Sequence, residues 1–189
     1  MALTLFARRP EPVEAPAPDP WPEIGETWKP EGVTIAQRYY NQAHAVVLVY
    51  TPDDDKTGHC YTVACLGCHF ASAYGGKPTY TPYGLAQAAT VANEHATTCR
   101  ALPRTLPARP DDDTVREQLH AWVNDNRRYA TNQLWLSSLD LRRLTMQRTT
   151  AWIENVLQQL AADQPDVLRI ERSSHSGYVS YYARSKPKN

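Results

Sequence analysis

The chain has no net charge and no long apolar segment. Its 20 Lys and Arg residues balance 20 Asp and Glu residues, so the overall charge does not indicate a nucleic acid, a membrane surface or an acidic substrate as a partner. No apolar run approaches the roughly 20 residues of a membrane-spanning helix. In the amino-terminal sequence MALTLFARRPEP a short apolar stretch precedes the arginines, the reverse of a secretory signal. These absences predict a cytoplasmic protein without a membrane partner.

The balanced charges are unevenly distributed. Residues 114–189 carry 11 Lys and Arg against 7 Asp and Glu, and the rest of the chain carries the opposite excess. A basic carboxy-terminal part is compatible with a local nucleic-acid surface. It is equally compatible with a few solvated arginines.

Cysteine is scarce, and its positions are clustered. The stretch GHCYTVACLGCH, residues 58–69, holds Cys60, Cys65 and Cys68, and the fourth cysteine, Cys99, follows His95 in NEHATTCR. In a reducing compartment such spacing indicates metal binding rather than disulfides.

One ligand set reads C-x2-C-x26-H-x3-C, from Cys65, Cys68, His95 and Cys99. A Cys-x2-Cys turn presents two thiolates to one ion, and residues four apart share a face of a helix. The set resembles the zinc fingers in which a hairpin carries a cysteine pair and a helix carries His and Cys, although its spacer is about twice the usual length of roughly 12 residues. The resemblance implies Zn²⁺ with four protein ligands. Such an ion has no open position for a catalytic water, so its role would be structural.

A second set uses all four cysteines, as C-x4-C-x2-C-x30-C through Cys60, Cys65, Cys68 and Cys99. This spacing resembles that of plant-type [2Fe–2S] ferredoxins. The bulky, β-prone residues between Cys60 and Cys65 are less suited to a loop that wraps a cluster. Unligated cysteines, or a set that includes His59 or His69, are further alternatives.

Composition divides the chain into four regions. Residues 1–32 are rich in proline and acidic residues and lack periodicity, which predicts a flexible lead-in. Residues 33–100 contain the β-branched run AVVLVY, a turn-forming segment, the returning strand HCYTVACLGC and an alanine-rich helix over 85–100. The stretch before the first run, VTIAQRYYNQA, is compatible with a helix or a strand. Residues 101–112 hold three prolines and predict a linker, and residues 113–189 form the basic part.

The pattern beyond the linker predicts three helices followed by two strands. TVREQLHAWVNDNRRY has apolar residues at helical spacing, with Asp113 or Thr114 as its cap and Glu117 completing a capping box. SLDLRRLT predicts a short second helix and QRTTAWIENVLQQLAAD a third. DVLRIERS and GYVSYYARS predict a hairpin.

This order resembles a winged helix-turn-helix over residues 113–185. The resemblance implies that the third helix is a recognition helix, whose short polar and basic residues reach base edges and phosphates. The candidate DNA contacts are Arg142 and Arg143 in the short helix, Gln147, Arg148, Thr149 and Thr150 at the start of the third, Arg172 and His175 in the wing, and Arg184 and Lys186 in the tail.

The expected fold class is α+β: a small zinc-stabilised hairpin-plus-helix unit joined to a winged helix. The expected function is sequence-specific or architectural binding of double-stranded DNA, by a transcriptional regulator or an accessory protein of a phage or mobile element. No catalytic constellation is visible, which predicts a non-enzyme. A [2Fe–2S] electron-transfer or cluster-sensing protein is one alternative. A protein-assembly adaptor, with a homodimer or another protein as partner, is another, because a fold alone does not decide its function.

Overall fold

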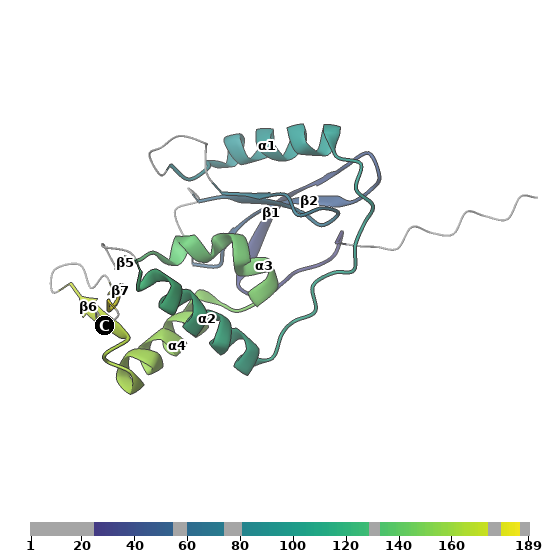
Figure 1. Ribbon diagram of the computed structural model, residues 1–189. Helices are drawn as coiled ribbons and strands as arrows, with labels where there is room; N and C mark the ends of the chain where they lie inside the picture. The colour runs from purple at the N-terminus through teal and green to yellow at the C-terminus, as the bar shows by residue number, and fades with distance from the viewer. Residues whose placement is uncertain (1–24, 55–59, 74–80, 129–132, 174–178, 186–189) are drawn as a thin grey trace, which may run out of the picture.

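The computed structural model describes residues 25–54, 60–73, 81–128, 133–173 and 179–185. Most of the predicted lead-in and the candidate residues His59, His175 and Lys186 lie outside these ranges. The chain is α+β, as expected, with two antiparallel sheets and four α-helices in the described part (Figure 1). No helix within those ranges combines the length and the apolar character needed to cross a bilayer.

The amino-terminal half is built on a four-stranded sheet in the order β1-β2-β3-β4. The run AVVLVY forms the central strand, as predicted, and every residue of that strand is buried. The stretch compatible with helix or strand forms the outer strand, whose register shifts between Ile35 and Gln37. The strands are β1 (Val33–Tyr40), β2 (Val46–Pro52), β3 (Thr62–Cys65) and β4 (Ala71–Ser72).

Both faces of β2 are covered because its side chains alternate between two hydrophobic clusters. One face packs beneath helix α1 (Leu85–Thr98), and the other faces α3 (Arg143–Met146) (Figure 1). The first cluster includes Val47, Val49, Val63, Ala88, Ala92 and Ala96, and the second includes Val46, Leu48, Tyr50, Ala64 and Leu144.

The carboxy-terminal half shows the predicted order of helix, short helix, helix and hairpin. The short helix consists of a 3-10 segment, η1, that continues into α3. A short strand that the pattern did not predict, β5, pairs with the hairpin and widens it to a sheet in the order β5-β7-β6. The remaining elements are α2 (Asp112–Asn126), β5 (Gln133–Leu134), η1 (Leu136–Arg142), α4 (Thr150–Asp163), β6 (Leu168–Arg172) and β7 (Val179–Ala183).

Helix α2 begins before the predicted caps. Asp111 is its N-cap, with extended backbone angles, and its carboxylate accepts the N–H of Thr114 at 2.7 Å. Asp113 lies in the first turn instead, where its negative charge is favourable near the helix amino terminus.

The two halves contact each other directly. The hydroxyl of Tyr50 on β2 donates to the carbonyl of Asp140 in η1 at 2.9 Å. The carboxylate of Asp53, which follows β2, accepts both the N–H and the hydroxyl hydrogen bond of Thr150 at the start of α4, at 3.0 and 2.8 Å. The sheet therefore packs against the carboxy-terminal helices across a shared interface.

Candidate metal centre

Four side chains predicted as one ligand set come together in the structure. The sulfur atoms of Cys65, Cys68 and Cys99 and a ring nitrogen of His95 all lie within 4.8 Å of one another. The Cys68 Sγ atom is 3.4 Å from His95 Nε2 and 4.0 Å from Cys99 Sγ. Tetrahedral zinc with ordinary bond lengths separates two sulfurs by about 3.8 Å and a sulfur from a nitrogen by about 3.6 Å. The observed separations therefore fit a single tetrahedral ion.

The cysteine pair sits on a tight turn at the end of β3. The N–H of Gly67 points at Cys65 Sγ and the N–H of Phe70 points at Cys68 Sγ, each at 3.4 Å. A Cβ atom on Gly67 would lie 2.9 Å from the carbonyl oxygen of Ala101, so a larger residue would push away the chain that leaves α1. Glycine is needed here for close approach of two backbones.

The other two ligands come from the end of α1. His95 lies in the last turn, and Cys99 is the C-cap, whose N–H donates to the carbonyl of His95 at 2.8 Å. The ring of Phe70 stacks on the imidazole of His95, with centroids 4.0 Å apart and planes at 11°. The predicted i, i+4 relation therefore holds, and an aromatic contact from the cysteine turn fixes the imidazole plane.

Burial and hydrogen bonds set the proton affinities of the ligands. Burial raises the pKa of the Cys65 thiol to about 12, although the N–H groups of Gly67 and Cys68 act in the opposite direction. Burial lowers the pKa of His95. Burial by itself would raise the pKa of the Cys99 thiol. Hydrogen bonds from donors that include the Ala101 N–H and the Asn41 amide outweigh this effect and lower the pKa. A metal ion must displace the thiol protons, so binding releases protons and weakens in acid.

Cys60 is not a member of the four-atom group. It precedes β3, whereas Cys65 lies at the opposite end of that strand. The [2Fe–2S] alternative, which needs Cys60 beside the other three cysteines, gains no support from this arrangement.

The structure differs from the expectation that the start of α4 is open to nucleic acid. Arg142, Arg172 and Arg184 are exposed. Thr149 is half-buried and caps α4 by accepting the N–H of Trp152 at 3.2 Å. The other described candidates from this region are buried: Arg143, Gln147, Arg148 and Thr150.

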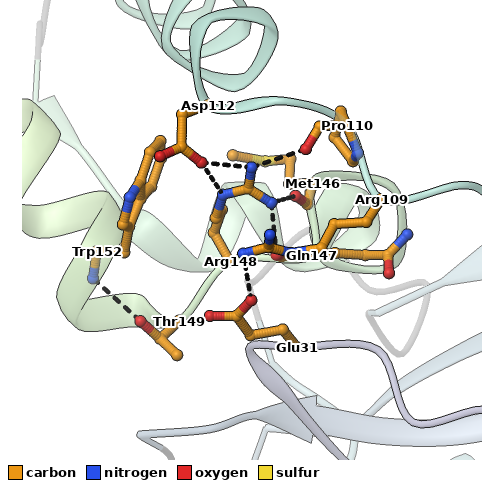
Figure 2. Close-up of polar contacts among 9 residues, drawn as sticks. All are labelled: Glu31, Arg109, Pro110, Asp112, Met146, Gln147, Arg148, Thr149 and Trp152. Atoms are coloured by element: carbon orange, nitrogen blue, oxygen red, sulfur yellow. Dashed lines mark hydrogen bonds and ion pairs between the residues drawn. The ribbon is translucent and has the colours of Figure 1, made fainter.

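Arg148 shows the physical reason for this burial (Figure 2). Its guanidinium has five N–H groups, and five hydrogen bonds use them. Two go to the carboxylate of Asp112, at 2.6 and 3.1 Å. The others go to backbone carbonyls, those of Pro110 at 2.7 Å, Gln147 at 2.9 Å and Met146 at 3.3 Å. A guanidinium with every donor occupied inside the protein has none left for a phosphate or a base.

Two residues beside the metal ligands were not predicted from the sequence. Phe70, two positions after the cysteine turn, carried only the weak signal of an aromatic residue next to the ligands in sequence. Asn41, whose amide donates to Cys99 Sγ at 3.3 Å, carried none, because 58 positions separate the two residues.

Comparison of the chain with known protein families, with curated proteins and with solved structures found no significant match.

Proposed function

We propose that the chain is a non-enzymatic cytoplasmic DNA-binding protein whose amino-terminal half is stabilised by a structural Zn²⁺. Such a chain would serve as a transcriptional regulator or as an accessory protein of a phage or mobile element. The proposal has two parts, the ion and the DNA surface, and each has its own test.

The donor set supports zinc. Three thiolates and one imidazole are the ligands that structural zinc sites use, and the separations fit a tetrahedron. Four protein ligands complete the coordination, so the ion would hold the cysteine turn against α1 and would not activate a water. The ion would thereby add a cross-link between the end of β3 and the end of α1.

The metal part is tested by elemental analysis of the purified chain. We expect one zinc per chain and a colourless solution. Cys60→Ala should retain the zinc, whereas Cys68→Ala and His95→Ala should lose it. Iron with sulfide, a red-brown colour and loss of metal in the Cys60 variant would instead favour the [2Fe–2S] alternative.

The DNA part rests on a group of arginines at the carboxy-terminal hairpin. Arg127, the C-cap of α2, donates from Nε to the carbonyl of Arg184 at 2.7 Å, which joins the end of α2 to the residue after β7. Arg169 on β6 lies over the ring of Tyr182 on β7. Arg172 is exposed at the end of β6, toward the wing tip. Because the start of α4 is buried, we assign the DNA contact to this hairpin and the adjoining end of α2.

Fluorescence anisotropy with a labelled random-sequence duplex tests this assignment across a salt series. The double variant with Arg172→Ala and Arg184→Ala removes two proposed phosphate contacts. It should bind more weakly, and the slope of log affinity against log salt should fall by about one per contact. Arg104→Ala, an exposed arginine beside the cysteine turn, is the matched control and should change neither quantity. Unchanged affinity in the double variant would contradict the assignment.

A protein-assembly adaptor is the second candidate, and two exposed apolar side chains favour it. Trp135 directly precedes η1 and Leu141 lies near its end. Their side chains are 54% and 41% exposed. An exposed tryptophan is a typical anchor of protein interfaces. If the wild-type chain does not bind duplex DNA, sedimentation of wild type and Trp135→Ser becomes the deciding measurement, and loss of a dimer in the variant would support the adaptor.

A further inference from the structure

Asn41 is a buried amide at the turn between β1 and β2, and every hydrogen-bonding position of its side chain is used. It is 5% exposed. Its Oδ1 atom accepts the N–H groups of Ala43 and Ala45, at 2.9 and 2.8 Å. Its Nδ2 atom donates to the carbonyl of Ala101 at 2.8 Å and to Cys99 Sγ at 3.3 Å. An amide has two donor hydrogens and two acceptor lone pairs, so this set of bonds is complete.

The surroundings determine which way the amide points. A flipped side chain would direct the NH₂ group at two backbone N–H donors and the oxygen at the sulfur and a carbonyl. The two acceptor contacts to the β1–β2 turn therefore fix Nδ2 on the side of Cys99.

The same turn holds the end of α1 by a second route. The N–H of Gln42 donates to the carbonyl of Cys99 at 3.3 Å, and the side-chain amide of Gln42 donates to the carbonyl of Thr97. Both adjacent amides therefore reach the carboxy-terminal end of α1, but only Asn41 touches a sulfur.

We propose that Asn41 is a positioning residue of the metal site, which orients the sulfur of Cys99 toward the ion. This inference rests on the proposed zinc site. The bond from Nδ2 fixes the position of Cys99 Sγ beside the other three ligand atoms. The second bond, to Ala101, fixes the chain immediately after the ligand and prevents Cys99 from turning away. Residues in this role contribute about 10- to 100-fold to metal affinity.

Asn41→Asp tests the role because it keeps the acceptor side of the amide and changes the side that faces Cys99 Sγ and the carbonyl of Ala101. The carboxylate can still accept the N–H groups of Ala43 and Ala45, but it places an oxygen against Cys99 Sγ. Gln42→Glu is the control for the added charge, at an exposed position. It makes the same chemical change and adds the same charge one residue away, against the Thr97 carbonyl instead of a sulfur.

The measurements are zinc affinity, by competition with a chromophoric chelator, and the visible spectrum after substitution with Co²⁺, which reports thiolate coordination directly. We expect Asn41→Asp to bind zinc about 10- to 100-fold more weakly than Gln42→Glu. Its thiolate-to-cobalt band should also be weakened or shifted. A purely structural role in the turn would leave the spectrum of the bound ion unchanged.

If Asn41→Asp does not fold, Asn41→Ser serves instead. Its hydroxyl can still accept the N–H of Ala43, two residues on, but is too short to reach Cys99. Equal zinc affinities and identical cobalt spectra in the Asn41 and Gln42 variants would overturn this inference and leave the zinc site intact. A wild-type chain that binds neither ion would overturn the zinc site and this inference together.

Discussion

Arg148 binds the start of α4 to the start of α2, and its side chain is 1% exposed. Taking a guanidinium out of water is costly unless its donors are satisfied, and here all five are. The ring of Trp152 lies 5.2 Å from the guanidinium carbon and adds a cation–π contact (Figure 2). The arrangement makes Arg148 a structural residue of the carboxy-terminal half.

Replacing Arg148 with alanine should destabilise the protein by about 3 kcal/mol. The change leaves three backbone carbonyls without their donor and removes the partner of Asp112. Arg148→Lys should recover part of the loss, because an ammonium supplies three donors and no planar fork. Equilibrium urea unfolding measures both, with the exposed Arg142→Ala as the control that should leave the free energy of unfolding nearly unchanged. If Arg148→Ala unfolds like the wild type and instead loses DNA affinity, Arg148 is a recognition residue after all.

At the scale of elements, α2 depends on its first turn. Asp111 accepts the Thr114 N–H, and this bond lowers the pKa of the carboxyl below its ordinary value of 3.8. The folded state therefore favours the charged carboxylate. Asp111 stabilises α2 above pH 3.8, and its contribution is lost as the pH falls through the lowered value.

Asp111→Asn should make this helix less sensitive to acid. Asparagine keeps an oxygen that can accept the Thr114 N–H but does not titrate. Circular dichroism melts above and below pH 3.8 should show that the wild type loses more stability in acid than Asp111→Asn does. Asp113→Asn, in the same turn but not the cap, removes only a charge near the helix terminus and should keep more of the wild-type acid sensitivity than Asp111→Asn does. Loss of metal in acid affects all three proteins alike, so the differences isolate the cap.

Most elements follow from local pattern, and the departures have local causes. The apolar run of β2 and the periodicity of α2 and α4 predict those elements. The same is true of the cysteine turn and of the i, i+4 pair that ends α1, because these relations span only a few residues. Asn41 was missed because its partner is distant in the chain. The burial of Arg148 was not predicted, because its partner Asp112 lies on a separate element, helix α2. Composition does not show which carboxylate an arginine pairs with.

At the scale of the whole molecule, the segment expected to be a linker, residues 101–112, contacts both halves. The amide of Gln147 donates to the carbonyl of Pro107 at 2.9 Å. Arg109 pairs with Glu31, just before β1, at 2.6 Å (Figure 2). From these contacts and the cluster that joins β2 to α3, we predict that the two halves unfold as one unit.

At Gly32 the backbones of the two halves approach each other closely. Its φ angle is 81°, and a Cβ atom there would lie 1.8 Å from the carbonyl oxygen of Arg148. Gly32→Ala therefore strains the backbone and separates β1 from the start of α4, which should cost at least about 1–3 kcal/mol. Gly84→Ala is the control: a Cβ atom there meets no atom within 4 Å, so the change alters only the N-cap of α1, at a smaller cost.

Hydrogen exchange distinguishes one folding unit from two. In Gly32→Ala the amides of β2 and of α4 should lose protection together, because the bond from Asp53 to Thr150 joins the end of β2 to α4 and the bond from Tyr50 to Asp140 joins β2 to η1. Loss of protection in only one half would show that the halves fold independently. Strand β2 also pairs with β3, which ends at Cys65. If β2 and α4 lose protection together in Gly32→Ala, chelating the metal should also expose the amides of α4 to exchange, although α4 is far from the ligands in sequence.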